Sequence, residues 1–454
     1  MKAILDIGKT HVKLQLVDED NQAHDSYQRK NAPLTGNYPH ADIDGIWRWL
    51  VSTLQLSPYT SSIQGFSITT HGATAALINA SRSDNGLVMP VLDYEYQGID
   101  ECSSDYQLYR PDFAHTYSPE LPAGLNLGKQ LFWLQQRDPA NFDSATHILL
   151  YPQYWAWRLS GQLAAEVTSL GCHTDMWNPD SHSYSSLVTQ CGWTEKMPPL
   201  RNAWDCLGTI TAAVSELTGL PADCKVRVGL HDSNASFIRY LSKANEAFTV
   251  ISTGTWTILM QNQGNTDNLN ASRDMLANVN IHGDPVCCAR FMGGREYERI
   301  CNHLGGDIRM AVEAEDIQTA IKNQWIVTPD FSEGNGPYGG ATPVIVAPIP
   351  VPAPTALATL YCALMIDQRL SDLKASGPIY IEGAFLKNPL LCALVAQLRP
   401  QQKVMLSSDN TGTVMGAAQL LSMDEPSEVP LTTCIASTFN GLEAYREQWY
   451  ALIE

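Results

Sequence analysis

The sequence is poor in basic residues, with 29 Lys and Arg against 47 Asp and Glu, and its formal net charge is -18. A protein that binds nucleic acid or an anionic membrane needs a basic surplus to neutralise phosphates. We therefore expect neither nucleic acid nor a membrane as a partner.

Long apolar runs, a leader pattern and paired cysteine motifs are also lacking. No uninterrupted apolar stretch reaches the roughly 18 residues that span a bilayer. The chain enters a strand pattern at once instead of the charged-then-apolar pattern of a secretory signal. Eleven cysteines, an odd number without a CxxC pair, favour reduced thiols over a disulfide framework or a structural zinc site. These features predict a cytoplasmic protein.

A chain of 454 residues is too long for one ordinary core and predicts two domains of about 200 residues each. We place the boundary near residue 243, in the polar segment 241–247, which gives domains 1–243 and 244–454. Strand patterns alternate with helix patterns, so the predicted class is α/β. The expected helices include segments 43–54, 125–136, 154–159, 210–221 and a long apolar helix within 347–370. Residues beyond about 425 read as a short closing appendage.

A carboxylate marks a predicted helix start in the middle of the chain. Asp232 precedes Ser233 and Asn234, which are good capping types, and the following residues continue as a helix. Such a carboxylate suits a general base over a bound hydroxyl group. The plainer alternative is that Asp232 only caps the helix.

Two segments share one layout: residues 3–17 and 247–264 each read as an apolar strand, a small-residue turn and an alternating strand. The turn at Thr253–Thr255 suits a phosphate cradle, because glycine lets the backbone approach an anion while hydroxyls and amides donate to it. The turn at Gly8–His11 presents its amides similarly. It is not a P-loop, since the upstream glycine of GxxxxGK[ST] is absent and a strand follows. The hairpins suggest two related domains and, with Asp232, phosphoryl transfer from a nucleotide to an alcohol.

A series of motifs in the correct order resembles the FGGY carbohydrate kinases, within the actin, hexokinase and Hsp70-like superfamily. The motifs are Asp6–Thr10, Thr70–Thr74, His231–Ser233, Ser252–Trp256, Ile379–Asn388 and Gly412–Ala418. The resemblance runs from about residue 2 to about residue 422. It implies two ribonuclease H-like α/β domains with an interdomain active-site cleft, an N-terminal domain that binds sugar and a C-terminal domain that binds nucleotide.

The resemblance also implies roles for individual residues. Asp232 is the expected catalytic base, and the sugar contacts are His71, Gly72, Thr74, His231, Asp232 and Ser233. The expected ATP contacts are Asp6, Gly8, Lys9, Thr10, Thr253, Gly254, Thr255, Gly383, Ala384 and Asn388. Mg²⁺ is the expected metal, held by Asp6 through water, and Lys9 is a charge partner for the transferring phosphate. Asp93 and Glu95 are weaker candidates for sugar contact. A strongly acidic chain can still bind ATP, because magnesium and local amides offset the charge.

The substrate stays open between several ketoses. His231-Asp232-Ser233 resembles rhamnulokinases and fuculokinases, which place His-Asp-Thr there, whereas Thr70–Thr74 resembles xylulokinases. We expect phosphorylation of the terminal hydroxyl of an L-rhamnulose- or L-fuculose-like ketose, with xylulose, another ketopentose or a polyol as the alternative. Glu382 and Ala384 flank a single glycine where the family usually has consecutive glycines. The sequence therefore leaves open which nucleotide base is preferred.

Another class of protein also stays open at this point. The same fold serves catalytically inactive sugar sensors and nucleotide-driven filament or chaperone proteins, which need no sugar base. ADP release from ATP without any sugar would favour the nucleotide-driven class. The oligomeric state, including a homodimer, is likewise open.

Overall fold

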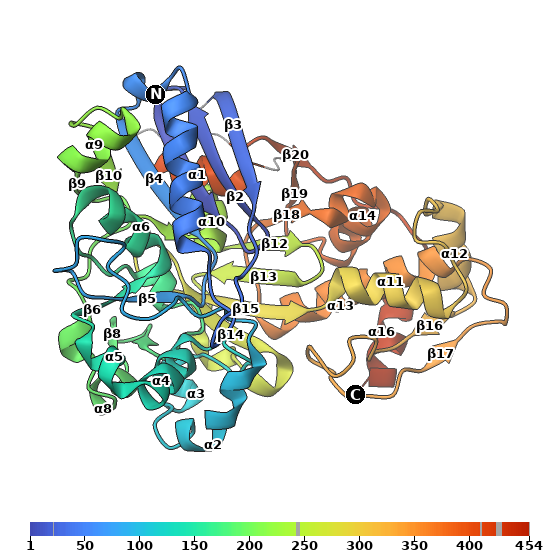
Figure 1. Ribbon diagram of the computed structural model, residues 1–454. Coiled ribbons are helices and arrows are strands. Elements are labelled where there is room, and N and C mark those ends of the chain that lie inside the picture. The colour runs from blue at the N-terminus through green and yellow to red at the C-terminus, as the bar shows by residue number, and fades with distance from the viewer. Residues whose placement is uncertain (21, 242–245, 409–410, 424–428, 454) are drawn as a thin grey trace. The chain divides into compact units, whose positions relative to one another are not determined.

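The computed structural model describes residues 1–20, 22–241, 246–408, 411–423 and 429–453, and the chain divides into two compact units (Figure 1). Unit 1 holds the described residues within Met1–Lys243, Ala277–Pro285 and Thr411–Glu428. Unit 2 holds those within Ala244–Leu276, Val286–Asn410 and Val429–Glu454. The boundary predicted at residue 243 falls among residues 242–245, outside the described residues, and stays a prediction. Two segments from the C-terminal half therefore belong to unit 1.

Unit 1 is built on a seven-stranded mixed sheet in the order β3-β2-β1-β4-β10-β9, with β11 also paired to β4. β1 and β2 form the antiparallel hairpin that the sequence predicts, and β1 pairs in parallel with β4. The strands are β1 (Lys2–Ile7), β2 (His11–Val17), β3 (Ala23–Lys30), β4 (Gly65–Thr70), β9 (Cys206–Thr209), β10 (Lys225–Arg227) and β11 (Leu230–His231). Two-stranded pairs of unit 1 are β5 (Ala75–Ile78) with β6 (His147–Leu150) and β7 (Trp177–Asn178) with β8 (Ser183–Tyr184).

Helices cover both faces of this sheet, which explains why β1 is apolar on both sides. Side chains alternate along a strand. Ala3, Leu5 and Ile7 accordingly pack in the cluster that contains α1, whereas Ile4 packs with α10 and α15. The longer helices of unit 1 are α1 (Ile43–Leu56), α4 (Leu127–Arg137), α6 (Tyr151–Ser160), α9 (Ala212–Thr218), α10 (Asp232–Leu241) and α15 (Gly412–Gln419). The shorter ones are α2 (Ser103–Tyr106), α3 (Phe113–Thr116), α5 (Pro139–Ser144), α7 (Val167–Leu170) and α8 (Ser186–Gln190).

Most of the second sheet belongs to unit 2, and it repeats the strand plan of the first. Its order is β14-β15-β13-β12-β18-β19-β20, in which β12 pairs antiparallel with β13 and parallel with β18. The predicted similarity of the two hairpins is therefore confirmed at the level of strand pairing. The strands are β12 (Phe248–Thr253), β13 (Thr257–Asn262), β14 (Met275–Val279), β15 (Pro285–Phe291), β18 (Ile379–Gly383), β19 (Val404–Ser407) and β20 (Leu431–Thr433). A separate pair joins β16 (Ile326–Val327) to β17 (Ile345–Val346).

The helices of unit 2 pack around the long helix predicted within 347–370, which spans Pro354–Asp372 (α13). Nearly its whole circumference is buried, as its continuous apolar pattern predicts. The other helices are α11 (Gly293–His303), α12 (Ala314–Lys322), α14 (Pro389–Leu398) and α16 (Leu442–Ile453).

The prediction that the chain ends in a short appendage is wrong. β20 extends the second sheet, and α16 contributes Leu442, Tyr445 and Trp449 to the core of unit 2. Trp449 is fully buried, and its indole Nε1 donates to the carbonyl oxygen of Val327 at 2.8 Å. Spacings of three and four residues place these three side chains on one face of the helix, a pattern that the sequence already contained.

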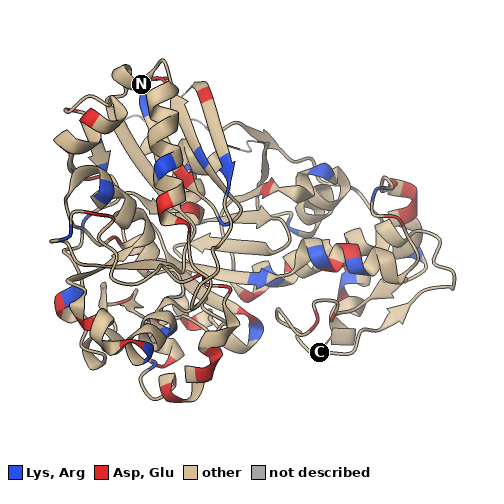
Figure 2. Ribbon diagram, viewed as in Figure 1, with Lys and Arg blue, Asp and Glu red and all other residues tan. Residues whose placement is uncertain are grey.

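Charged residues are distributed over both units, where Figure 2 shows Lys and Arg interspersed with Asp and Glu. The acidic excess of the sequence is thus not confined to one element. Across the described ranges, every helix is too short or too polar to cross a lipid bilayer.

Candidate active site

The junction between β11 and α10 places Asp232 at the first residue of a helix, as predicted. The backbone N–H of Ser233 donates to Asp232 Oδ1 at 2.7 Å, and His231 Nε2 lies 3.2 Å from the same oxygen. The Asp232 side chain is 31% exposed, whereas that of His231 is 7% exposed. One carboxylate oxygen is thus engaged by the protein while the side chain stays accessible to a ligand.

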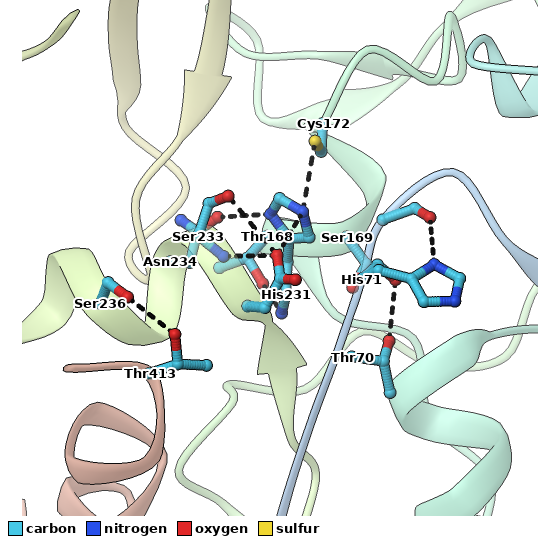
Figure 3. A network of polar contacts seen from close by, with 12 residues as sticks. Thr70, His71, Thr168, Ser169, Cys172, His231, Ser233, Asn234, Ser236 and Thr413 are labelled. Atoms are coloured by element: carbon cyan, nitrogen blue, oxygen red, sulfur yellow. Dashed lines mark hydrogen bonds and ion pairs between the residues drawn. The ribbon is translucent and has the colours of Figure 1, made fainter. Parts of the chain in front are cut away.

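His231 is held on several sides by residues of unit 1 (Figure 3). Its Nδ1 lies 3.2 Å from Asn234 Oδ1, and its backbone N–H donates to the hydroxyl of Thr168 at 3.0 Å. That hydroxyl in turn donates to Glu166 at 2.6 Å. Burial raises the pKa of Glu166 to about 7, although hydrogen bonds from Thr168 act in the opposite direction. Glu166 and Thr168 therefore fix the backbone that precedes Asp232.

The segment after β4 meets the same histidine. A Cβ atom on Gly72 would lie only 2.9 Å from His231 Nε2, so only glycine lets this segment approach so closely. The Thr74 hydroxyl donates to the carbonyl oxygen of Gly72 at 3.2 Å, and His71 Nδ1 lies 3.0 Å from the same oxygen. Burial lowers the pKa of His71. The structure thus brings together the predicted sugar-binding residues of the two segments.

The turn between β1 and β2 is closed by backbone and side-chain hydrogen bonds. The Gly8 N–H donates to His11 O at 2.9 Å, and Asn31 Nδ2 donates to Gly8 O at 2.8 Å. Asp6, at the end of β1, is buried, and its pKa is raised to about 6, first by burial and then by the charge of Asp232, against a smaller effect of Lys13.

Lys9 leaves this turn toward the acidic residues that the sequence proposes as weaker candidates. Its ammonium group pairs with Asp93, lies 3.3 Å from Glu95 and stands 4.4 Å from the centre of the Tyr94 ring. Lys9, His71, Thr74, Asp93 and Tyr94 line one small cavity of about 30 Å³. Lys9 therefore borders the same small cavity as two of the predicted sugar contacts, His71 and Thr74. Thr10 is exposed at the tip of the turn.

In unit 2, the turn between β12 and β13 contains Thr253, which is hydrogen-bonded within the protein, and Thr255, which is exposed. The Thr253 hydroxyl donates to Glu382 O at 2.6 Å and accepts from the Phe385 N–H at 2.9 Å. Both functions of this hydroxyl are therefore used within the protein. Thr255 is exposed, and a Cβ on Gly254 would meet nothing nearer than 3.8 Å. The Gly254 N–H donates to Trp256 O at 2.9 Å, and a side chain at position 254 would extend away from the protein.

A cavity of about 680 Å³ lies beside the predicted adenosine motif and is lined by Ala384, Asn388, Gly294 and Tyr297 among others. Gly383 adopts φ 90°, and a Cβ there would lie 2.2 Å from Thr253 O. Position 383 therefore requires glycine, and this is the only glycine that the motif contains. Asn388 Oδ1 accepts from the Leu391 N–H, and its Nδ2 donates to the Thr359 hydroxyl, so Asn388 shapes the cavity wall through bonds within the protein.

Several residues of these sites escape prediction from the sequence. Asn31 and Tyr94 come from a loop and a turn, and Glu166 and Thr168 come from the start of the short helix α7, without a local motif. Gly293 and Gly294 begin α11, and Gly294 packs against the turn so closely that a Cβ would lie 2.2 Å from Gly254 O. A glycine pair before a helical pattern is the sequence feature from which the contact between Gly294 and Gly254 could be predicted.

Among the described residues, no group of three or more His, Cys, Asp and Glu side chains forms a metal cage. Mg²⁺ needs none, because it is usually bound by one or two carboxylates, water and substrate phosphates. Asp6 fits that role, since a cation would oppose both the burial and the charge of Asp232 that favour its protonation.

Solved structures with the same architecture place the two mixed sheets in the actin- and hexokinase-like fold class. A carbohydrate kinase from Novosphingobium aromaticivorans superimposes with a TM-score of 0.91 at 33% identity, over 100% of this chain and 98% of that one. A ligand-bound xylulose kinase from Lactobacillus acidophilus gives 0.77 at 16% identity over 100% and 97% of the two chains. The predicted fold class is confirmed.

Residues 1–238 match the N-terminal domain of the FGGY family of carbohydrate kinases, and residues 245–429 match the FGGY C-terminal domain. The chain therefore belongs to the FGGY family of carbohydrate kinases, as the motifs indicate. It is 26% identical over 279 residues to a probable L-xylulose kinase of Pasteurella multocida, covering 56% of this chain and 54% of that protein. It is 25% identical over 208 residues to an L-fuculokinase of Salmonella typhi, covering 45% and 43%. These alignments span about half the length of the curated relatives.

Proposed function

We propose that this protein is an ATP-dependent sugar kinase that transfers the γ-phosphate of ATP to the terminal hydroxyl of a ketose. The observation that carries the proposal is Asp232, an accessible carboxylate fixed at the start of α10 by Ser233 and His231. A carboxylate held in this way accepts the proton of an alcohol as the alcohol oxygen attacks phosphorus in line. Asp232 is therefore the proposed catalytic base.

Unit 1 would bind the sugar. His231 and Ser233 lie beside the base, Gly72 lies against His231, and two further proposed contacts, His71 and Thr74, line a small cavity. Their hydroxyl, imidazole and backbone groups are suited to bind neighbouring sugar hydroxyls. A site built on such hydrogen bonds rejects analogues that lack a hydroxyl, because its buried polar groups are then left unpaired.

Unit 2 would bind the nucleotide. We assign the cavity beside Gly383, Ala384 and Asn388 to the nucleoside and the turn at Gly254 and Thr255 to the phosphates. Thr253 acts by holding that turn against β18. Gly8, Lys9 and Thr10 of unit 1 are the proposed contacts to the transferring phosphate. Transfer requires that the two bound substrates reach each other in line, with water excluded to limit ATP hydrolysis.

Mg²⁺ completes the proposed cofactor set. Bound to the ATP phosphates, it would neutralise the charge that develops during transfer. Asp6 would hold it through a water molecule. The transition state is loose, so positioning and charge neutralisation supply most of the rate, and Asp232 removes the proton late.

The xylulokinase-like segment at Gly72 lies against the ring of His231, which belongs to the fuculokinase-like segment. This proximity supports the proposal that both segments contact one sugar. The relatives named L-fuculokinase and probable L-xylulose kinase support a ketose. We favour an L-rhamnulose- or L-fuculose-like ketose, and xylulose, another ketopentose or a polyol is the alternative.

All eleven cysteines lie among the described residues and none of them is in a disulfide bond, which suits a reducing compartment. A cytoplasmic location is therefore part of the proposal.

The test is ADP release from ATP and Mg²⁺ with L-rhamnulose, L-fuculose, L-xylulose, polyols or no sugar. Asp232→Asn should keep nucleotide and sugar binding while turnover falls by about a hundredfold or more, the usual contribution of a general base. Asp138→Asn is the matched control, because Asp138 caps α5 with its side chain and asparagine caps equally well. Turnover of Asp232→Asn within about threefold of the parent would refute the assignment of the base.

Product analysis separates the remaining alternatives. Phosphorus-coupled NMR should locate the new phosphate on the terminal carbon of the preferred ketose. Preference for an aldohexose, or phosphate on an anomeric oxygen, would refute the ketose assignment. ADP release at the full rate without sugar would instead indicate the nucleotide-driven class.

A further inference from the structure

A cysteine that the motifs do not include lies against the histidine of the proposed sugar site. Cys172 Sγ is 3.7 Å from His231 Nε2, and Cys172 is 2% exposed (Figure 3). Gly72 closes the same place, because a Cβ on it would lie 3.4 Å from this sulfur. The thiol and the imidazole are therefore enclosed together.

The hydrogen bonds of Asn234 determine which nitrogens of the His231 imidazole carry a hydrogen. Asn234 Nδ2 donates to the backbone carbonyl of Val279, which can only accept. Asn234 Oδ1 therefore faces His231 Nδ1 at 3.2 Å, and Nδ1 must carry a hydrogen. In a neutral ring, Nε2 would then present its lone pair to Asp232 Oδ1 at 3.2 Å, which is repulsive. A hydrogen on both nitrogens removes this conflict.

We propose that Cys172 and His231 form a thiolate–imidazolium pair and that Cys172 thereby positions the base Asp232. The proton leaves Sγ and binds Nε2, so the S–H bond breaks, an N–H bond forms and the total charge is unchanged. Nε2–H then lies between the thiolate and Asp232 Oδ1, which leaves Oδ2 for the substrate hydroxyl. Cys172 acts through His231 and is a positioning residue; this role in catalysis rests on the proposed function.

The surrounding titratable groups favour this assignment. Burial alone would raise the pKa of Cys172, but the charges of His173 and His231 outweigh it and lower that pKa. Burial alone would lower the pKa of His231, but Cys172 and Asp232 outweigh it and raise that pKa. His71 and Glu166 also face the ring: His71 acts against its positive charge and Glu166 supports it.

The pair can be detected without any assay of activity. Thiolate absorbance at 240 nm, measured at pH 7 on the full chain, should fall by about one thiolate when Cys172 is replaced by Ser. Cys102→Ser is the control, because Cys102 is also buried in unit 1 but burial raises its pKa to about 11, so its removal should change nothing. Equal absorbance of the parent and Cys172→Ser would overturn the pair. If Cys172→Ser does not fold, Cys172→Ala replaces it with the same expected fall in absorbance, and an absorbance of Cys172→Ala equal to that of the parent overturns the pair.

The positioning role is tested by the pH profile of kcat/KM. Without the thiolate, His231 loses its proton at lower pH. The kcat/KM of Cys172→Ser should therefore fall by at least about tenfold between pH 6.5 and pH 9, while the kcat/KM of the parent changes by no more than about twofold. Cys172→Asp restores a negative charge and should restore the parent profile. If kcat/KM falls by the same factor at every pH in both Cys172→Ser and Cys172→Asp, the role of Cys172 is purely structural and the positioning role is overturned. The absorbance test does not depend on kinase activity, so failure of the proposed function and failure of the pair are distinguishable.

Discussion

Replacing Gly416 by Ala should strongly perturb unit 1, because this residue lies where α15 packs against the helix that carries Asp232. A Cβ on Gly416 would lie 1.6 Å from the backbone carbonyl oxygen of Ala235 in α10 and 3.0 Å from Ile238 Cγ2. Side-chain Cβ atoms essentially never approach closer than 3.0 Å, so the helices must separate locally by about 1.4 Å. The obstacle is backbone, which cannot rotate away as a side chain can.

The expected loss of unfolding free energy for Gly416→Ala is about 2 to 3 kcal/mol, the upper range for overpacking a close-packed interface. Gly412→Ala is the matched control on the same helix, because a Cβ there would meet only ordinary contacts at 3.6 Å and beyond. Its unfolding free energy should stay within about 0.5 kcal/mol of the parent or rise, since alanine restricts the unfolded chain.

Urea denaturation followed by tryptophan fluorescence measures both variants. Activity provides a second measurement, because a displacement of about 1 Å at a reacting group can cost on the order of a hundredfold in turnover. Equal urea midpoints for Gly416→Ala and Gly412→Ala would refute the packing of α15 on α10 through Gly416.

Three further predictions concern unit 2. Gly254→Val should fold normally, because a Cβ there meets nothing within 3.8 Å, but calorimetry should show weaker ATP binding with unchanged sugar binding; unchanged ATP affinity would contradict the phosphate role. Trp449→Ala should lower the unfolding free energy by about 3 to 5 kcal/mol, and a loss below about 1 kcal/mol would restore the view of the C-terminus as an appendage. The pKa of Glu296 is raised to about 7, chiefly by burial, so the folded state holds its proton more tightly than the unfolded chain. This group alone should therefore lower the free energy of unfolding by about 3 kcal/mol as the pH rises from about 4.5 to above 7. In urea melts the decline of Glu296→Gln should be smaller than that of the parent by this amount, because Asp6 and Glu166 still contribute to it.

The sequence predicts those parts of the molecule whose structure is decided locally. The two hairpins, the helix start at Asp232 and the long helix α13 follow from apolar periodicity, small turn residues and capping types. Cys172, Glu166 and Asn31 do not, because their neighbours are set by the topology of the whole unit. Nothing near Cys172 in the sequence indicates that His231, 59 residues later, lies against it.

The departures in the adenosine motif have a similar explanation. Glu382 contributes its backbone carbonyl to Thr253, a function that any residue can serve. Only Gly383 has the positive φ and the close backbone contact that require glycine. A sequence motif is defined by residue types, whereas this turn depends on the backbone conformation at one position, residue 383.

The assignment of residues 411–423 to unit 1 has a consequence for synthesis on the ribosome. Val414 and Ala417 of α15 cover Ile4 and Ala235, and the Ser236 hydroxyl lies 3.0 Å from that of Thr413. A nascent chain released only as far as α10 therefore exposes the apolar side chains that α15 covers in the complete chain. They stay uncovered while about 170 further residues are translated, so unit 1 is completed last although most of it is made first, and a gene fragment cut after α10 should yield an aggregating product.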